Sequence, residues 1–162
     1  MNDVAKSENN FKNVIILNFR IFFYRFRTRM QDSIGKAIMK VSNRDLAPVM
    51  KTGIVNVLST AKLSALMEQA SCSALETACF ISGQTSVAAT MKLHHRRPSP
   101  IGANVTAIAR VTDIDKDGIH FEIEAFDESG LIGTALHTRV FVNKDLFERK
   151  CYDSARLAQL IE

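Results

Sequence analysis

Several features that would assign a function quickly are scarce or missing in this sequence. Its three cysteines cannot all pair, and they show neither CxxC spacing nor a Cys/His ligand spacing. The four histidines, at positions 94, 95, 120 and 137, also lack the spacing of a metal site. The sequence therefore predicts free thiols in a reducing compartment, the cytoplasm, and no metal centre.

A basic face of the kind that binds nucleic acid is missing from the main part of the chain. Residues 1–41 contain eight Lys or Arg and three Asp or Glu, a net charge of +5, within a chain whose formal net charge is +4. The other 121 residues therefore have a net charge of −1. Because the positive charge belongs to an N-terminal extension, we expect no nucleic-acid partner.

No apolar run is long enough for a transmembrane helix, which needs about 20 such residues. The best candidate lies at residues 11–30, where Arg20 divides the run and five residues are basic. A signal peptide would begin with its charges and end in small residues, and this segment does neither. Three interpretations stay open: a membrane-surface amphipathic segment, an organelle presequence, or a non-native extension before a start at Met30.

The N-terminal extension, residues 1–30, is basic and aromatic, and its apolar residues follow no regular period. We therefore expect it to pack poorly, to be poorly ordered or non-native, and to make no stable membrane insertion. A chain that begins at Met30 should keep its melting temperature and activity. The rest of the sequence predicts one globular domain over residues 31–150 and a tail or short helix over residues 151–162.

One long helix is predicted over residues 61–82. Ser59 and Thr60 are a helix-start signal, and Gly83 is a usual residue at a helix end. Apolar side chains recur on one stripe at helical spacing: Leu63, Leu66, Met67, Ala70, Ala74 and Ala78. The other faces are nearly as apolar, and the charged residues are only Lys62, Glu68 and Glu76. A helix that is apolar on almost every side is a buried helix.

Four segments of strand length follow the helix and can supply the sheet that buries it: residues 87–97, 105–114, 119–126 and 132–142. Residues 115–118 and 127–130 join the last three of these segments, and both links contain Asp and Gly, as hairpin turns do. Such short links require antiparallel neighbours. Residues 34–49 indicate a first, irregular strand or loop. The expected architecture is α+β, an antiparallel sheet wrapped around one long central helix.

Three polar residues on this framework are candidates for chemistry. Glu68 is the first, because a buried carboxylate costs several kcal/mol unless it is paired or protonated; the alternative is that it faces solvent or a gap. His95 can carry a proton near neutral pH, unless it belongs to an exposed basic strand end. Since adjacent strand residues point to opposite faces, only one of His94 and His95 can face the same pocket as Glu68. Thr60 suits a helix cap, beside free N–H groups that can polarise a carbonyl.

These motifs, in this order, resemble the fluoroacetyl-CoA thioesterase-like group of the hotdog-fold thioesterase superfamily. The resemblance rests on residues 58–70, which read LSTAKLSALMEQA, on His95 with the turn PSPIG at 98–102, and on residues 127–142. Each motif alone is weak, but together at matching spacing they are specific. Ile54 stands where the fluoroacetate-specific enzyme has an aromatic residue, so that enzyme's narrow substrate choice does not carry over with the resemblance.

The resemblance implies a hotdog fold and the hydrolysis of a short or medium acyl-CoA to free acid and coenzyme A. It places Thr60, Glu68 and His95 at the catalytic positions of the family, and Gly102 and Arg139 at positions that hold the thioester or coenzyme A. Glu68 would act as nucleophile or as general base on water, while His95 shuttles the proton and Thr60 holds the oxyanion. No cofactor is implied, because coenzyme A is part of the substrate.

The spacing of Thr60 and Glu68 bears on the oligomeric state. They are eight residues apart, which is about 12 Å along a helix at a rise of about 1.5 Å per residue. Two groups so separated cannot both reach one carbonyl carbon, so we expect a homodimer or a dimer of dimers, with each site built from two chains, as in hotdog relatives. Two other functions stay open: a hotdog hydratase or dehydratase, and a non-catalytic acyl-CoA sensor with a nucleic-acid-binding N-terminus.

Overall fold

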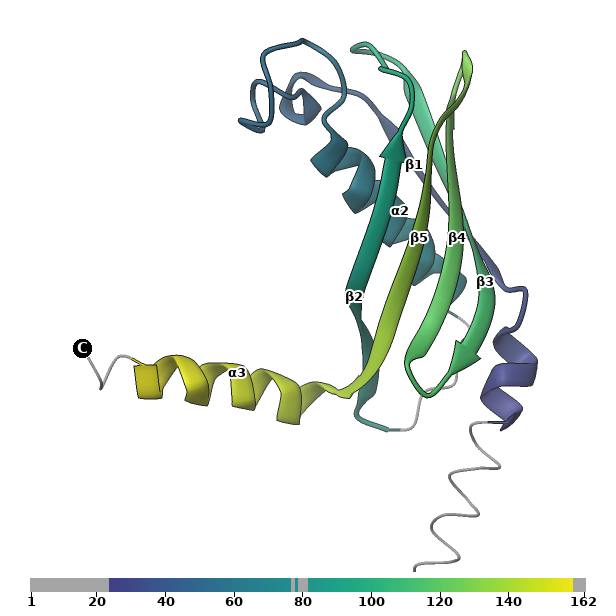
Figure 1. Cartoon of the computed structure of the whole chain (residues 1–162), viewed down its shortest axis with the longest axis vertical. Coiled ribbons are helices and arrows are strands. Elements are labelled where there is room, and N and C mark those ends of the chain that lie inside the picture. The colour runs from purple at the N-terminus through teal and green to yellow at the C-terminus, as the bar shows by residue number, and fades with distance from the viewer. Residues whose placement is uncertain (1–23, 77, 79–81, 159–162) are drawn as a thin grey trace, which may run out of the picture.

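The computed structural model describes residues 24–76, 78 and 82–158 of the chain (Figure 1). Its sheet has five strands in the order β1-β3-β4-β5-β2, and every neighbouring pair is antiparallel. The strands are β1 (Ile34–Lys40), β2 (Gln84–His95), β3 (Asn104–Asp115), β4 (Gly118–Asp127) and β5 (Gly130–Asn143). The four predicted strands are thus confirmed, and the segment expected to be irregular contains a regular strand, β1, followed by a short 3-10 turn.

Helix α2 (Thr60–Ala74) packs on this sheet, and the sheet curls around it (Figure 1). Its buried side chains are Leu63, Leu66, Met67, Ala70, Ser71 and Ala74. Strand β1 comes closest to the helix at Gly35, where a Cβ atom would lie 2.1 Å from the carbonyl oxygen of Ala70. Glycine is required at this position because any side chain would collide with the helix backbone. The expected α+β fold, with an antiparallel sheet around a central helix, is confirmed.

The helix ends earlier than predicted. It stops at Ala74 rather than Ser82, and Leu75 caps it with its N–H bonded to the carbonyls of Cys72 and Ser73. Gly83, expected to close the helix, has a φ of +78° and instead precedes β2. The apolar pattern continues past the helix because Leu75 is still buried and Ala78 still packs against the core. The apolar period therefore correctly indicated which residues are buried, but buried residues need not be helical.

Residues 24–30, the described part of the N-terminal extension, form a helix that packs on the domain. Phe26 and Met30 are 5% and 0% exposed, and the ring of Phe26 meets Phe141 of β5 edge-on at 5.3 Å. Arg27 also forms an ion pair of 2.9 Å with Asp113 of β3. The expectation of poor packing is therefore wrong for these residues, because two apolar side chains one turn apart are enough to anchor a short helix. The rest of the extension, residues 1–23, lies outside the described residues.

A chain that begins at Met30 should therefore melt below the full-length chain, contrary to the expectation from the sequence. Removing Phe26 exposes core surface, and Phe26→Ala alone should lower the free energy of unfolding by roughly 3 kcal/mol. Tyr24→Ala is the matched control, since Tyr24 lies on the same helix but is 71% exposed, and it should change stability by less than about 0.5 kcal/mol. Denaturant unfolding measures both values. Equal stability of the two variants would show that this helix contributes nothing.

The C-terminal segment forms a surface helix, which is one of the two alternatives, a tail or a short helix, expected from the sequence. Helix α3 (Lys144–Ala158) projects away from the sheet in Figure 1, and its side chains are exposed from Lys144 to Ser154. The Asn143 side chain starts it by accepting a hydrogen bond of 3.0 Å from the N–H of Leu146. The helix crosses residue 150, so the described part of the predicted tail, residues 151–158, is the second half of α3.

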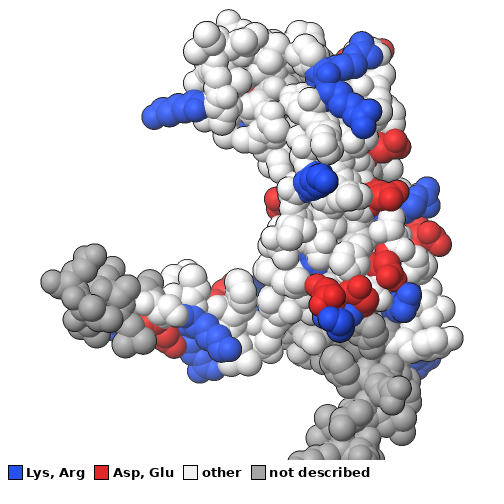
Figure 2. All heavy atoms as spheres, in the orientation of Figure 1, with Lys and Arg blue, Asp and Glu red and all other residues white. Residues whose placement is uncertain are grey.

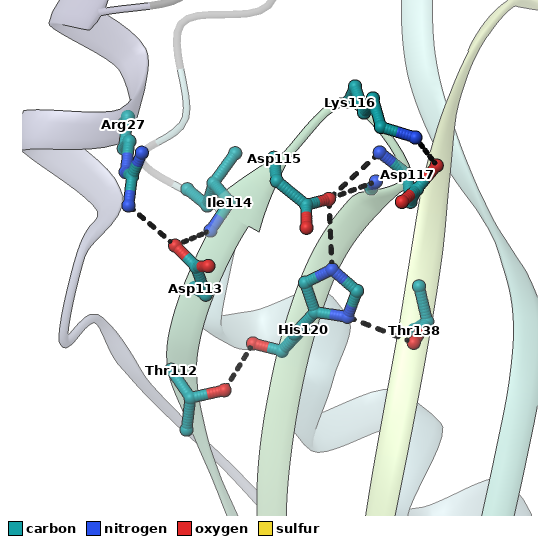
Figure 3. A network of polar contacts seen from close by, with 10 residues as sticks. Arg27, Thr112, Asp113, Ile114, Asp115, Lys116, Asp117, His120 and Thr138 are labelled. Atoms are coloured by element: carbon teal, nitrogen blue, oxygen red, sulfur yellow. Dashed lines mark hydrogen bonds and ion pairs between the residues drawn. The ribbon is translucent and has the colours of Figure 1, made fainter.

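The hairpin between β3 and β4 is held by a polar network that Figure 3 shows. Asp115 accepts hydrogen bonds from the backbone N–H groups of Asp117 and Gly118 and from Nε2 of His120, at 2.8, 3.1 and 3.0 Å. The contact with His120, and then the backbone bonds, hold the pKa of the Asp115 carboxyl below its ordinary value. Nδ1 of His120 lies 3.2 Å from the hydroxyl of Thr138, so this histidine joins three strands and the turn. The predicted hairpin is confirmed.

Candidate functional site

Thr60 begins helix α2 but does not cap it. The cap is Ser59, whose hydroxyl accepts a hydrogen bond of 3.2 Å from the N–H of Lys62. The hydroxyl of Thr60 lies instead 3.0 Å from Nδ1 of His95, at the end of β2. The N–H groups of Thr60 and Ala61 make no hydrogen bond to any described residue, as is usual in the first turn of a helix. A hydroxyl, an imidazole and free N–H donors therefore meet at one point.

His95 faces the inside of the domain, while its neighbour His94 is exposed. This is the alternation expected for two adjacent strand residues. Burial lowers the pKa of His95 below its ordinary 6.5, and the backbone of Arg97 opposes this only in part. The imidazole is therefore neutral at pH 7 and able to accept a proton. Its Nε2 atom is buried and has no hydrogen-bond partner among the described residues.

A hollow of about 430 Å³ opens beside Thr60 and His95. Its other walls are the loop before α2, at residues 52–58, and the residues that follow β2, from Arg96 to Pro98. The loop carries apolar side chains into solvent, with Ile54 94% exposed. This position, which the resemblance associates with substrate choice, therefore lies at the mouth of the hollow.

Glu68 does not reach this hollow in the single chain. It is half-buried on α2 and forms neither a hydrogen bond nor an ion pair with any residue that the structure describes. It lines an open groove of about 450 Å³ along the helix, beside the small residues Ala61, Ser64, Ala65 and Cys72. The structure thus brings Thr60 and His95 together and leaves Glu68 on a separate, open part of the same helix.

Gly102 and Arg139, which the resemblance assigns to thioester or coenzyme A binding, lie in different surroundings. Gly102 is in the exposed turn before β3, where its φ of +89° favours glycine, and its N–H bonds to the carbonyl of Val41. Arg139 is buried on β5, and its guanidinium donates to the hydroxyl and the carbonyl of Ser86 at 3.0 and 2.8 Å. The structure therefore gives Arg139 a partner on β2 within the protein.

The sequence alone assigns no individual role to His137, which is 1% exposed and among the most buried polar residues of the core. It alternates with Leu136 and Thr138 on β5 and shares the inner face with Ala135 and Arg139. This alternation was the available signal, since a histidine on the inner face of a sheet is a buried polar group that needs partners.

Other site types find no support in the described ranges. Residues 24–76, 78 and 82–158 contain no group of three or more His, Cys, Asp or Glu side chains that could hold a metal ion. No helix in that part of the chain combines the length and apolarity that a membrane span requires. Figure 2 shows Lys and Arg interspersed with Asp and Glu over the sheet, without one extended basic patch on this face.

Comparison with known proteins shows the family of the chain. Residues 41–145 match the family model described as fluoroacetyl-CoA-specific thioesterase. The chain belongs to this family. It is therefore a thioesterase, an enzyme that hydrolyses acyl-CoA thioesters. Among curated proteins, none matches the chain.

Solved structures agree on the fold, which is the hotdog fold. A Thermus thermophilus hypothetical protein, described as a thioesterase superfamily member, has a TM-score of 0.73 at 18% identity, over 82% of this chain and 96% of that one. The fluoroacetyl-CoA thioesterase FlK has a TM-score of 0.70 at 19% identity, over 76% and 95%. A hot-dog-like protein from Thermanaerovibrio acidaminovorans has a TM-score of 0.69 at 23% identity, over 78% and 94%.

The stability of this thioesterase should fall as the pH drops from 7 toward 5. Burial holds the pKa values of His95 and His137 below their ordinary 6.5 in the folded chain. Below pH 6.5 the unfolded chain therefore binds more protons than the folded one, and the stability present above that pH is lost toward the folded pKa values. Melting temperatures across this range measure the effect. A flat profile would show that neither imidazole is held neutral.

Proposed function

We propose that this thioesterase hydrolyses a short or medium acyl-CoA at a site built from two copies of the chain. One copy contributes Thr60 and His95, and the other contributes Glu68. The observation that carries the proposal is the contact of 3.0 Å between the Thr60 hydroxyl and Nδ1 of His95, at a helix start that opens into a hollow. The working form is then a homodimer, alone or paired into a dimer of dimers. The free thiols of Cys72 and Cys151 support a reducing location such as the cytoplasm.

The geometry at Thr60 suits a thioester carbonyl. As the carbonyl carbon becomes tetrahedral, negative charge develops on its oxygen, and the N–H groups of Thr60 and Ala61 can donate to it at the positive end of α2. The Thr60 hydroxyl can donate as well while His95 Nδ1 orients it. His95 is neutral, so it can accept and return a proton during the reaction.

Glu68 supplies the carboxylate, which either attacks the carbonyl carbon or removes a proton from the attacking water. The C–S bond then breaks, and coenzyme A leaves as a thiolate that is protonated by the site or by solvent. Because a thiolate is a good leaving group, the reaction needs no additional electrophile to activate the thioester. Within one chain Glu68 is about 12 Å along the helix from Thr60, a distance that one substrate carbonyl cannot bridge.

The groove around Glu68 supports a second copy of the chain as the source of the carboxylate that acts beside Thr60 and His95. Its walls are mostly small side chains, Ala61, Ser64, Ala65 and Cys72, which permit close approach of another helix or strand. Strand β2, which carries His95, is the last strand of the sheet, so one of its edges has no neighbour among the strands that the structure describes. We also propose that coenzyme A contacts the turn at Gly102, and that Arg139 contributes to its site through Ser86 rather than by direct exposure.

Coenzyme A release from a panel of acyl-CoAs tests the proposed function. Acetyl-, butyryl- and octanoyl-CoA should each be offered to the full chain, with free thiol and free acid measured in parallel. The proposal predicts saturable release of one thiol for each acid formed. A hydratase would instead convert an enoyl-CoA without releasing thiol, and a sensor would bind acyl-CoA without turnover. The His/Asp pair that a hydratase requires is not at this site, since His120 and Asp115 lie at the hairpin between β3 and β4.

A further inference from the structure

Helix α3 has apolar side chains that the described part of the chain leaves uncovered. Its residues are exposed from Lys144 to Ser154, with Leu146 at 47% and Phe147 at 50% exposed. The family match over residues 41–145 ends where α3 begins, so almost all of this helix lies outside the matched part of the chain. A helix of this length is marginal on its own in water, and packing of an apolar face supplies most helical stability in proteins.

The side chains of α3 divide between two halves of the helix. One half holds apolar side chains and one lysine, whose alkyl chain can lie along an apolar surface: Leu146, Phe147, Cys151 and Lys150. The other half holds a tyrosine and charges of both signs: Asp145, Glu148, Arg149, Tyr152 and Asp153. A helix that lies on a membrane has a polar face rich in Lys and Arg. The mixed charges of α3 therefore favour a protein surface as its partner.

The position of α3 directs it past the edge of the sheet. The N–H of Lys144 bonds to the carbonyl of Gly83 at 2.9 Å, and Asn143 of β5 lies opposite Gln84, the first residue of β2. From there α3 runs across the strand direction and beyond β2, the last strand of the sheet (Figure 1). Its 15 residues extend about 22 Å, which is more than four strand spacings of about 4.8 Å. The helix thus occupies the space beside the outer edge of β2.

The homodimer proposed above puts a second copy of the chain in this space. A two-fold axis brings the same edge of both copies together, and two such edges share a hydrogen-bond ladder when they run antiparallel. The Gln84 end of β2 in one copy then lies beside the His95 end of β2 in the other. In Figure 2 the molecule is concave on this side, between α3 and the residues that precede α2, so its shape accommodates a second copy.

The His95 end of the sheet presents an exposed apolar patch. His95 and the loop before α2 line the same hollow. Four large apolar side chains of this loop are exposed: Val49, Met50, Ile54 and Val55. Single exposed apolar residues are ordinary, but a cluster of them marks an interaction site. This apolar loop of one copy therefore lies at the end of the sheet that α3 of the other copy reaches.

We propose that α3 is an arm that crosses to the second copy and packs Leu146, Phe147 and Cys151 on that copy's loop of residues 49–55. The inference rests on the homodimer of the proposed function. The contact is reciprocal, so each dimer has two such arms. Because the loop is a wall of the hollow at Thr60 and His95, the arm of one copy covers the mouth of the other copy's site.

Cross-linking through the native thiol of Cys151, which is exposed, tests this contact in the full chain. Ile54→Cys adds a thiol at a position that is 94% exposed, so the fold should not change. The isolated dimer of this variant, treated with a short bis-maleimide, should become a covalent dimer. Peptide mass spectrometry should find residue 54 of one chain joined to residue 151 of the other.

Two controls restrict the result to this contact. Adding Cys151→Ser should return the amount of covalent dimer to that of the wild type. Lys116→Cys is the matched position control, since the Lys116 side chain is 88% exposed on the hairpin at the Gln84 end of the sheet. In the antiparallel dimer that hairpin is far from the partner's arm, so this variant should form no covalent dimer through residue 151.

Dimer affinity gives a second test. Phe147→Glu should raise the dimer Kd at least about tenfold in sedimentation experiments, the scale of one lost interface anchor. Arg149→Glu introduces the same residue on the other half of α3, and it should leave the Kd near the wild-type value.

A monomeric chain, or a dimer of Ile54→Cys without the 54–151 link, overturns the inference, as does an equal Kd for Phe147→Glu and Arg149→Glu. Binding to phosphatidylserine vesicles that Phe147→Glu alone abolishes would assign α3 to a membrane surface and also overturn it. Coenzyme A release by the wild type is measured in parallel. Normal release without the link defeats this inference alone, whereas the link without release defeats the proposed function.

Discussion

Glu68→Gln should lower acyl-CoA turnover at least about a hundredfold, the scale of a lost general base or nucleophile, with the fold intact. The substitution keeps the size of the side chain and removes only the carboxylate. Since Glu68 forms no hydrogen bond or ion pair with any described residue, the amide breaks no internal contact. The melting temperature should therefore stay near that of the wild type while kcat collapses. Steady-state coenzyme A release and thermal unfolding measure the two quantities.

Glu76→Gln provides the matched control for this experiment. Glu76 lines the same groove two turns further along the chain, and it is exposed. The same chemical change at this position should leave kcat and KM at their wild-type values. Normal turnover in Glu68→Gln would end the catalytic assignment and leave Glu68 as a half-buried acid without a reaction. Equal losses in both variants would indicate that the negative charge of the groove matters, rather than one carboxylate.

Most of the sheet could be predicted because its strands have one buried face. In β4, for example, Ile119, Phe121, Ile123 and Ala125 alternate with more exposed residues, and the turns beside it contain Asp and Gly. Strand β1 was harder to predict from the sequence. It packs against helix α2 through Gly35, which has no apolar side chain that could indicate burial. The end of α2 was misplaced for a related reason, because Leu75 stays buried after the helix has stopped.

The helix at residues 24–30 was missed because its anchoring depends on partners far along the chain. Phe26 meets Phe141, and Arg27 pairs with Asp113, contacts that no local pattern encodes. A period was sought over the whole extension, whereas only two apolar side chains of this short helix, Phe26 and Met30, are buried. Tertiary packing decides such a segment, and a weak local pattern does not exclude it.

The candidate site was predictable as a set of residue types and not as an arrangement. Thr60 and His95 are 35 residues apart, and their contact exists because β2 ends beside the start of α2. Nothing in the sequence around Arg139 shows that its guanidinium binds Ser86, so its burial could not be foreseen. The sequence assigned no role to His137, because the buried Nε2 without a hydrogen-bond partner among the described residues is visible only in the structure. The roles of all five predicted site residues stay predictions.

The shared site makes a second large prediction, on mixed dimers of Thr60→Ala and Glu68→Gln chains. Each variant alone forms dimers in which both sites have the same defect. Thr60→Ala should lose less activity than Glu68→Gln, because the backbone N–H groups of Thr60 and Ala61 remain to hold the oxyanion. If each site joins Thr60 and His95 of one chain to Glu68 of the other, a mixed dimer has one doubly altered site and one unaltered site. Its activity must then exceed that of both parents.

The most direct measurement is therefore coenzyme A release by the purified heterodimer, prepared by co-expression of the two variants with different affinity tags. We predict about half of the wild-type turnover, because one of the two symmetry-related sites is unaltered. The homodimers of each variant, prepared with the same tags, give the baselines. Heterodimer activity equal to the mean of the two homodimers would mean that Thr60 and Glu68 of each site come from the same chain, and it would contradict the account.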